Sequence, residues 1–191
     1  VKVYNTDFEN IYSEDAINIF RSNFEIDKNN YKNIASDAID IDFSKGEIKS
    51  SKFENIKNDA IDFSGSEVEI NQIFIKNVGD KAISGGEKSN LYGADVNIEN
   101  VEIGITSKDF SSLSFENIEI NNTKVAFCAF QKKPEYGPGY IKSSNVTLSN
   151  VDVNFLIEEK SQMIIDDSIV ETTSGVIEDM LYGRQYGKSS K

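Results

Sequence analysis

Small residues recur every 22 positions from residue 16 to residue 126 of this 191-residue chain. Each is followed directly by a large apolar residue, and six members keep the spacing without a slip. A fixed period of this length predicts a chain that coils into a stack of similar units, each burying its apolar side against its neighbours. The small residues are Ala16, Ala38, Ala60, Ala82, Gly104 and Ala126.

Two further apolar columns follow the same period. The second consists of Ile26, Ile48, Ile70, Gly93, Phe115 and Leu148. The third consists of Tyr31, Phe53, Ile75, Ile98, Ile120 and Val153. Short apolar segments with alternating positions are typical of strands, because a helix needs a longer run at a period of about 3.6 residues. The sequence therefore predicts an all-β fold, a right-handed single-stranded parallel β-helix (solenoid), with about 22 residues per rung and roughly 7–8 rungs.

An asparagine stands two residues after most members of the third column. Its amide can donate a hydrogen bond to one neighbour and accept one from another, so asparagines on successive rungs can form a ladder. We expect this ladder to lie at a buried corner and to satisfy backbone groups there, which is a structural role and not a catalytic one. The residues are Asn10, Asn33, Asn55, Asn77, Asn100 and Asn122.

Several phrases of the sequence resemble known β-helix repeats. S-D-A-I-D-I at 36–41 and N-D-A-I-D-F at 58–63 are similar to repeats of the pectate-lyase-like superfamily. The segments at 79–89 and 104–111 resemble β-helix segments of large bacterial surface and secreted proteins, some of which carry spore-coat-kinase-like domains. The resemblance covers roughly residues 1–155. It implies the fold more than an activity, because the matching positions are mostly those that build rungs.

We expect a single β-helix domain over residues 1–186, long enough to bury a continuous core. The period lengthens once, from 22 to 33 residues, between the last two members of the second column. Residues 131–140 hold both prolines and predict an inserted surface loop. Residues 156–186 predict irregular last rungs and a cap over the end of the stack, with 187–191 as a tail. The abrupt first rung predicts a piece of a larger protein, or end-to-end association through terminal rungs.

The charge of the chain bears on its partners. A net charge of −12 and a pI near 4.5 repel phosphate backbones and anionic lipids, so we expect neither nucleic acid nor a membrane surface as partner. No apolar run approaches the roughly 20 residues that span a bilayer, so membrane insertion is not expected either. Cys128 is the only cysteine and leaves no internal disulfide.

Two acidic columns flank the small residues. Their spacing brings Asp37, Asp40, Asp59 and Asp62 together on adjacent rungs, where carboxylates about 5 Å apart repel one another and raise each other's pKa. Ligands that are all oxygen atoms would select Ca²⁺, so these four residues are candidates for a calcium site. The alternative is structural: an aspartate before a turn accepts hydrogen bonds from backbone N–H groups, and Lys81 above Asp59 relieves part of the repulsion.

A mixed acid and base cluster follows one turn later. Glu87 and Asp109 both stand five residues past the small-residue column, and Lys108 adjoins them. These three are the candidate catalytic residues of a polysaccharide lyase, in which a base removes the proton beside a uronate carboxylate. A glycoside hydrolase would use a carboxylate pair instead. The chain has no histidine and no arginine near this cluster, which favours an ion-pair lattice on a solvated edge.

The inserted loop supplies candidate ligand-binding residues, because loops on a rigid scaffold usually carry the contacts. Tyr136 and Tyr140 could stack on a sugar ring, with Lys132 and Lys133 beside them. We therefore predict a non-catalytic β-helix, extracellular or on the cell surface, that acts as a scaffold or binding module for a glycan or a partner protein. The alternative is a carbohydrate-active enzyme domain, lyase-like and calcium-assisted or a glycoside hydrolase. No cofactor other than calcium is expected.

Overall fold

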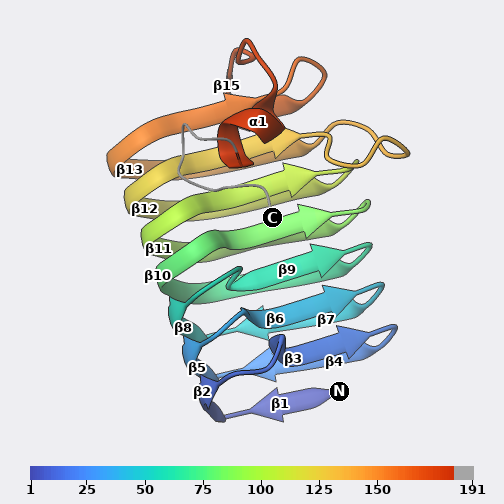
Figure 1. Cartoon of the computed structure of the whole chain (residues 1–191), viewed down its shortest axis with the longest axis vertical. Helices are drawn as coiled ribbons and strands as arrows, with labels where there is room; N and C mark the ends of the chain where they lie inside the picture. Colours follow the sequence, from blue (N-terminus) through green and yellow to red (C-terminus); the bar gives the residue numbers. More distant parts are fainter. Residues whose placement is uncertain (183–191) are drawn as a thin grey trace.

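A computed structural model describes residues 1–182, which coil into a parallel β-solenoid of about seven turns (Figure 1). Each turn supplies one strand segment to each of three faces, and segments one turn apart pair in parallel. The predicted all-β solenoid with its spacing of about 22 residues is therefore confirmed. The right-handed sense of the coil stays a prediction.

The first turns build the three faces from separate short strands. In chain order these are β1 (Lys2–Tyr4), β2 (Asp7–Ile11), β3 (Asp15–Phe20), β4 (Asn23–Asp27), β5 (Asn30–Ile34), β6 (Asp37–Asp42), β7 (Lys45–Lys49), β8 (Lys52–Ile56) and β9 (Ile61–Ser64). The later strands run through all three faces: β10 (Glu67–Gly86), β11 (Asn90–Lys108), β12 (Ser112–Phe130) and β13 (Tyr140–Ile157). The stack ends with the antiparallel pair β14 (Gln162–Ile165) and β15 (Ser168–Ile169), followed by α1 (Ile177–Tyr182).

The three faces are named by their first strands. The first face begins with β1, β4 and β7, the second with β2, β5 and β8, and the third with β3, β6 and β9. Strands β10 to β13 then contribute their beginning, middle and end to these faces in turn, as their register with the earlier strands shows.

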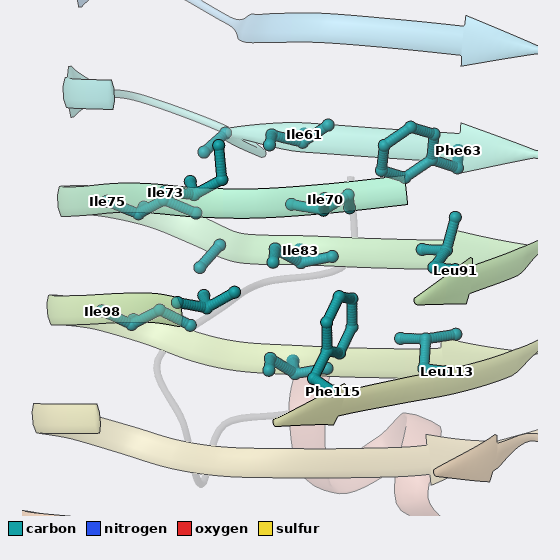
Figure 2. Packing of buried hydrophobic residues seen from close by; sticks show 14 of the residues in the cluster. Ile61, Phe63, Ile70, Ile73, Ile75, Ile83, Leu91, Ile98, Leu113 and Phe115 are labelled. Atoms are coloured by element: carbon teal, nitrogen blue, oxygen red, sulfur yellow. The ribbon is translucent and has the colours of Figure 1, made fainter. Parts of the chain in front are cut away.

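The core is a set of stacked columns inside the coil (Figure 2). The ring of Tyr31 stacks between Phe8 and Phe53, with ring centroids 4.9 and 4.7 Å apart and interplanar angles of 3° and 2°. Tyr31 and Phe53 are almost fully buried. Because the same column holds a similar side chain on every rung, burial and parallel pairing support each other, which is why the period was legible in the sequence.

The register after the inserted loop differs from the prediction. Phe115 pairs with Ser143 and Ile120 pairs with Leu148, so the lengthened turn has 28 residues and not 33. The pattern of apolar residues misled the prediction because Ser143 is polar although its side chain is buried. The insertion is thus a short loop, and the solenoid keeps its order as far as Ile157 at the end of β13.

Helix α1 lies against the side of the stack. Ile177 and Leu181 pack on the outer side of the third face, in a second apolar cluster that contains Val125, Phe130 and Leu156. This segment therefore covers a face of the solenoid, whereas the sequence predicted that it would cover the end. The remainder of the predicted cap and the predicted tail, residues 183–191, lie outside the described residues. Among residues 1–182 no helix is long and apolar enough to cross a membrane.

Candidate functional site

A groove of about 840 Å³ runs along the outside of the solenoid, where the second face turns into the third. One wall is the column of asparagines that the sequence singled out. The other wall stands two residues further along each turn and includes Lys57, Glu102, Lys124 and Asp152. Tyr12, a residue that is 85% exposed, lies at the N-terminal end of the groove.

The asparagines form a continuous ladder of side-chain hydrogen bonds. Each Nδ2 group donates to the Oδ1 atom of the asparagine one turn earlier. The donor–acceptor distances for the donors Asn33, Asn55, Asn77, Asn100 and Asn122 are 3.1, 3.0, 2.8, 2.6 and 3.1 Å. All six ladder residues have positive φ angles, between 53° and 59°. Asparagine tolerates this left-handed region better than most residues, and its presence there makes the sharp turn between the two faces.

The ladder lies at the surface, so the predicted buried corner is wrong. Asn55 and Asn77 are half-buried and the other ladder members are exposed. The left-handed turn sends the asparagine side chain outward, and the next residue, such as Ile56 or Val78, points into the core. An amide inside the ladder uses one N–H and one oxygen lone pair for its neighbours, so a second N–H and a second lone pair remain for a ligand.

The column of aspartates has a structural role in part. The Oδ1 atom of Asp37 accepts hydrogen bonds from the backbone N–H of Asp59 at 2.8 Å and from the side chain of Asn58 at 2.6 Å. One turn later, the Oδ1 atom of Asp59 accepts from the backbone N–H of Lys81 at 2.9 Å. Each carboxylate thus satisfies a backbone donor of the next rung, in agreement with the structural interpretation.

Lys81 lies in a buried ion-pair cluster. Its ammonium is 3.4 Å from the carboxylate of Asp59 and 3.0 Å from that of Asp80, and its side chain is 4% exposed. Burial acts to lower the pKa of Lys81, but the two carboxylates outweigh it and hold this pKa well above its ordinary value. Burial raises the pKa of Asp59 to about 6 against the opposing attraction of Lys81. The cluster therefore acts as a fixed cross-link between rungs.

Asp40 and Asp62 stand next to each other on the outer side of the third face. Burial raises the pKa of Asp40 to about 7, and the charges of Asp42 and Asp62 add to the effect. The ammonium of Lys108 is 3.6 Å from Asp62. Among residues 1–182, no three acidic, histidine or cysteine side chains come together in a way that could hold a metal ion. The calcium site at Asp37, Asp40, Asp59 and Asp62 stays a prediction that gains no support from this geometry.

The inserted loop is fastened to the turns beneath it. The Oδ1 atom of Asp109 accepts from the backbone N–H groups of Lys132 and Lys133 at 2.8 and 2.7 Å. The ammonium of Lys133 pairs with Glu87. The side chain of Gln131 donates to the carbonyl oxygen of Tyr136 at 2.7 Å, inside the loop. Glu87, Asp109 and Lys133 therefore fasten the base of the loop by binding one another and the backbone. Lys108, the third residue of the candidate catalytic cluster, lies with its ammonium against Asp62 instead.

The remaining predicted residues are more dispersed. Tyr136 is half-buried in the loop, with the ammonium of Lys88 5.8 Å from its ring centroid. Tyr140 is the first residue of β13. Lys132 keeps part of its side chain exposed, yet partial burial lowers its pKa, and the charges of Lys108 and Lys81 lower it further.

Sequence reasoning missed the contact between α1 and the third face. A signal was present in the outward columns of that face, which change from polar to apolar along the stack. The column of Asp62, Ser84 and Thr106 continues with Cys128 and Leu156. Outward apolar residues on a solvated face indicate that another segment covers them.

The fold and its groove define the chain as a parallel β-solenoid with a lateral groove. Searches against family models and against curated proteins gave no match. Among solved structures, the chain is similar to the catalytic domain of a GH87 alpha-1,3-glucanase variant in complex with tetrasaccharides, with 12% identity and a TM-score of 0.22. The similarity covers 84% of this chain and 49% of that one, so the chain spans about half of its length.

Proposed function

We propose that this chain is a non-catalytic glycan-binding module whose site is the asparagine groove. The observation that carries the proposal is the groove of about 840 Å³ whose wall is a ladder of exposed and half-buried amides. A binding site of this volume is large enough for a short oligosaccharide.

The chemistry of the amides matches that of a glycan. A sugar hydroxyl both donates and accepts hydrogen bonds, and each ladder asparagine keeps one donor and one acceptor for a ligand. The rungs repeat at about 4.8 Å, so the groove presents these groups in a regular row to an extended chain of sugars. The exposed ring of Tyr12 adds a surface on which a sugar can stack.

The solenoid also favours binding by its rigidity. The backbone of the groove is held by parallel pairing on consecutive rungs, so a ligand orders few groups when it binds. The net charge of −12 favours a neutral glycan over a polyanion. An extracellular or cell-surface setting within a larger protein is part of this proposal, and a partner protein is the alternative ligand.

The test compares an asparagine that lines the groove with an asparagine that lies outside it. Asn77 is a middle member of the groove ladder, bonded to Asn55 and Asn100. Asn117 is the middle member of a second, shorter ladder with Asp95 and Asn145, and does not line the groove. Both have positive φ angles, 56° and 54°, so glycine can replace either one without backbone strain.

A glycan array identifies a neutral oligosaccharide ligand, and calorimetry then measures its affinity. We expect Asn77→Gly to weaken binding roughly 5- to 10-fold, as the loss of one hydrogen bond predicts, and Asn117→Gly to leave it unchanged. The proposal is wrong if no neutral glycan binds, or if both variants weaken binding equally.

A second candidate function rests on Lys132. An amine with a lowered pKa can act as a general base, which a lyase needs to remove a proton beside a uronate carboxylate. The nearby acids Asp62 and Asp59 disfavour it, because they would repel such a substrate. Ultraviolet absorbance of unsaturated products from uronate polymers, with and without Ca²⁺, tests this function. If the chain is a lyase, Lys132→Ala should abolish the unsaturated product, whereas the control Lys142→Ala, on the exposed side of β13, should not. Absence of product from every polymer excludes a lyase activity.

A further inference from the structure

Two phenylalanine rings are exposed at the turn between the third and the first face. Phe20 ends β3 and is 53% exposed, and Phe43 follows β6 and is 49% exposed. Their rings meet edge to face, with centroids 6.0 Å apart and an interplanar angle of 87°. The guanidinium of Arg21 lies 5.0 Å from the centroid of Phe20 and 5.8 Å from that of Phe43. The three side chains form one aromatic and cationic surface, which we call the Phe–Arg surface.

The backbone of this surface is strained. Arg21 and Phe43 both have a φ angle of 49°, in the left-handed region that bulky side chains avoid. One turn later the same position is Gly65, with a φ angle of 61°, which adopts this conformation without strain. The turn itself therefore does not require a phenylalanine. A strained and exposed aromatic residue is a feature from which a binding role can be inferred.

A hollow of about 380 Å³ adjoins the Phe–Arg surface. Arg21 and Phe43 line it together with the polar residues Ser22, Asn23 and Lys45 and the carboxylate of Glu67. The ammonium of Lys45 is neutralised by Glu67 at 2.8 Å. Within residues 1–182 the guanidinium of Arg21 forms no ion pair with any carboxylate, although the whole chain carries a net charge of −12.

We propose that the Phe–Arg surface and this hollow bind a carboxylated sugar, such as a uronic acid at the end of a glycan. A guanidinium binds a carboxylate through two parallel hydrogen bonds, and the aromatic rings offer a flat apolar face to the sugar ring. Ser22 and Asn23 supply hydrogen-bonding groups for sugar hydroxyls. A ligand with one carboxylate fits best, because the net charge of the chain repels a polyanion. This site lies at a different corner from the asparagine groove and does not depend on it.

The probe is a disaccharide that ends in glucuronic acid, and its neutral counterpart ends in glucose. Calorimetry or NMR titration measures both against the intact chain. We expect the acidic disaccharide to bind and the neutral one to bind at least about tenfold more weakly, since a charge-assisted hydrogen bond is lost. Equal affinity for the two probes, or no binding of the acidic probe at the highest soluble concentration, overturns the proposal.

Variants separate a binding role from a structural one. Arg21→Gln and Phe43→Gly should each weaken binding of the acidic probe about tenfold or more. Phe43→Gly relieves the backbone strain, so the melting temperature should not fall. Lys32→Gln, which removes an exposed positive charge on β5, should leave binding unchanged. If Phe43→Gly lowers the melting temperature and leaves binding of the acidic probe unchanged, the Phe–Arg surface stabilises the fold and does not bind the ligand.

Discussion

Asp40 provides a sharp test of the electrostatics of the third face. It stands in the outward aspartate column, where Asn18 donates a hydrogen bond to it at 2.9 Å. Burial raises its pKa from 3.8 to about 7, and the neighbouring charges of Asp42 and Asp62 act in the same direction. The folded chain therefore binds a proton at Asp40 more tightly than the unfolded chain does.

The sign and size of the effect on stability follow from this difference. A group with a raised pKa favours the folded state when it is protonated, so the free energy of unfolding should rise as the pH falls from about 7 toward 4. A shift of about three pKa units corresponds to at most about 4 kcal/mol, at 1.36 kcal/mol per unit. Because the carboxyl group is only half-buried and water screens its neighbours, we expect about 1–2 kcal/mol.

Urea unfolding at pH 5 and at pH 8 measures this contribution. The wild-type chain should be more stable at pH 5. Asp40→Asn, which keeps the shape of the side chain and an acceptor for Asn18, should be more stable than the wild type at pH 8 and should show a smaller pH dependence. Some dependence should persist, because burial also raises the pKa of Asp37. Glu116→Gln, an exposed change on β12, is the control. The reasoning fails if acidification does not stabilise the wild type, or if Asp40→Asn retains the full pH dependence.

Three further substitutions test the interior. Lys81→Met leaves Asp59 and Asp80 without their buried cation, so it should lower the free energy of unfolding by about 3–5 kcal/mol in urea titrations. Unchanged stability would contradict a cross-linking role for Lys81. Phe53→Ala, in the stacked aromatic column, should cost about 3–5 kcal/mol by the same assay, and a loss below about 1 kcal/mol would mean that the column is loosely packed. At Gly93, φ is 153° and an added Cβ would stand 1.8 Å from a carbonyl oxygen of the preceding turn. Gly93→Ala should therefore lower the melting temperature clearly, and an unchanged melting temperature would refute this close approach.

The solenoid could be predicted from the sequence because its contacts repeat. A residue such as Ile61 pairs with an isoleucine on the rung above and on the rung below, so one rule accounts for many positions. The prediction failed where a polar residue entered the column, at Ser143, because apolar spacing was the only guide to register. The next asparagine of the ladder position, Asn150, has a φ angle of 52° and could have given the correct register of 28 residues.

The contacts of the loop and of α1 could not be predicted in the same way. The pair between Glu87 and Lys133 and the packing of Leu181 on the third face each occur once, between segments that have no fixed spacing. The sequence placed the loop and the charged residues close together. It could not show that these charges would satisfy one another, since this depends on the path of the loop after Gln131.

The asparagine column differs from the other turns in a way that bears on its role. The turn between the first and the second face also uses a residue at positive φ, and there the chain places Lys28, Ser50 and Gln72 at φ angles of 47° to 57°. The left-handed backbone alone therefore does not require asparagine. What the groove column adds is a longer side-chain ladder, of six asparagines, whereas the other turn has a short one of Asp95, Asn117 and Asn145. Asn77 can serve the long ladder only with an amide that donates and accepts. This ladder lies open along a groove, where the second N–H and the second lone pair of each inner amide remain for a ligand. The exposed position of the amides, and not their repetition, is the reason to look for a ligand there.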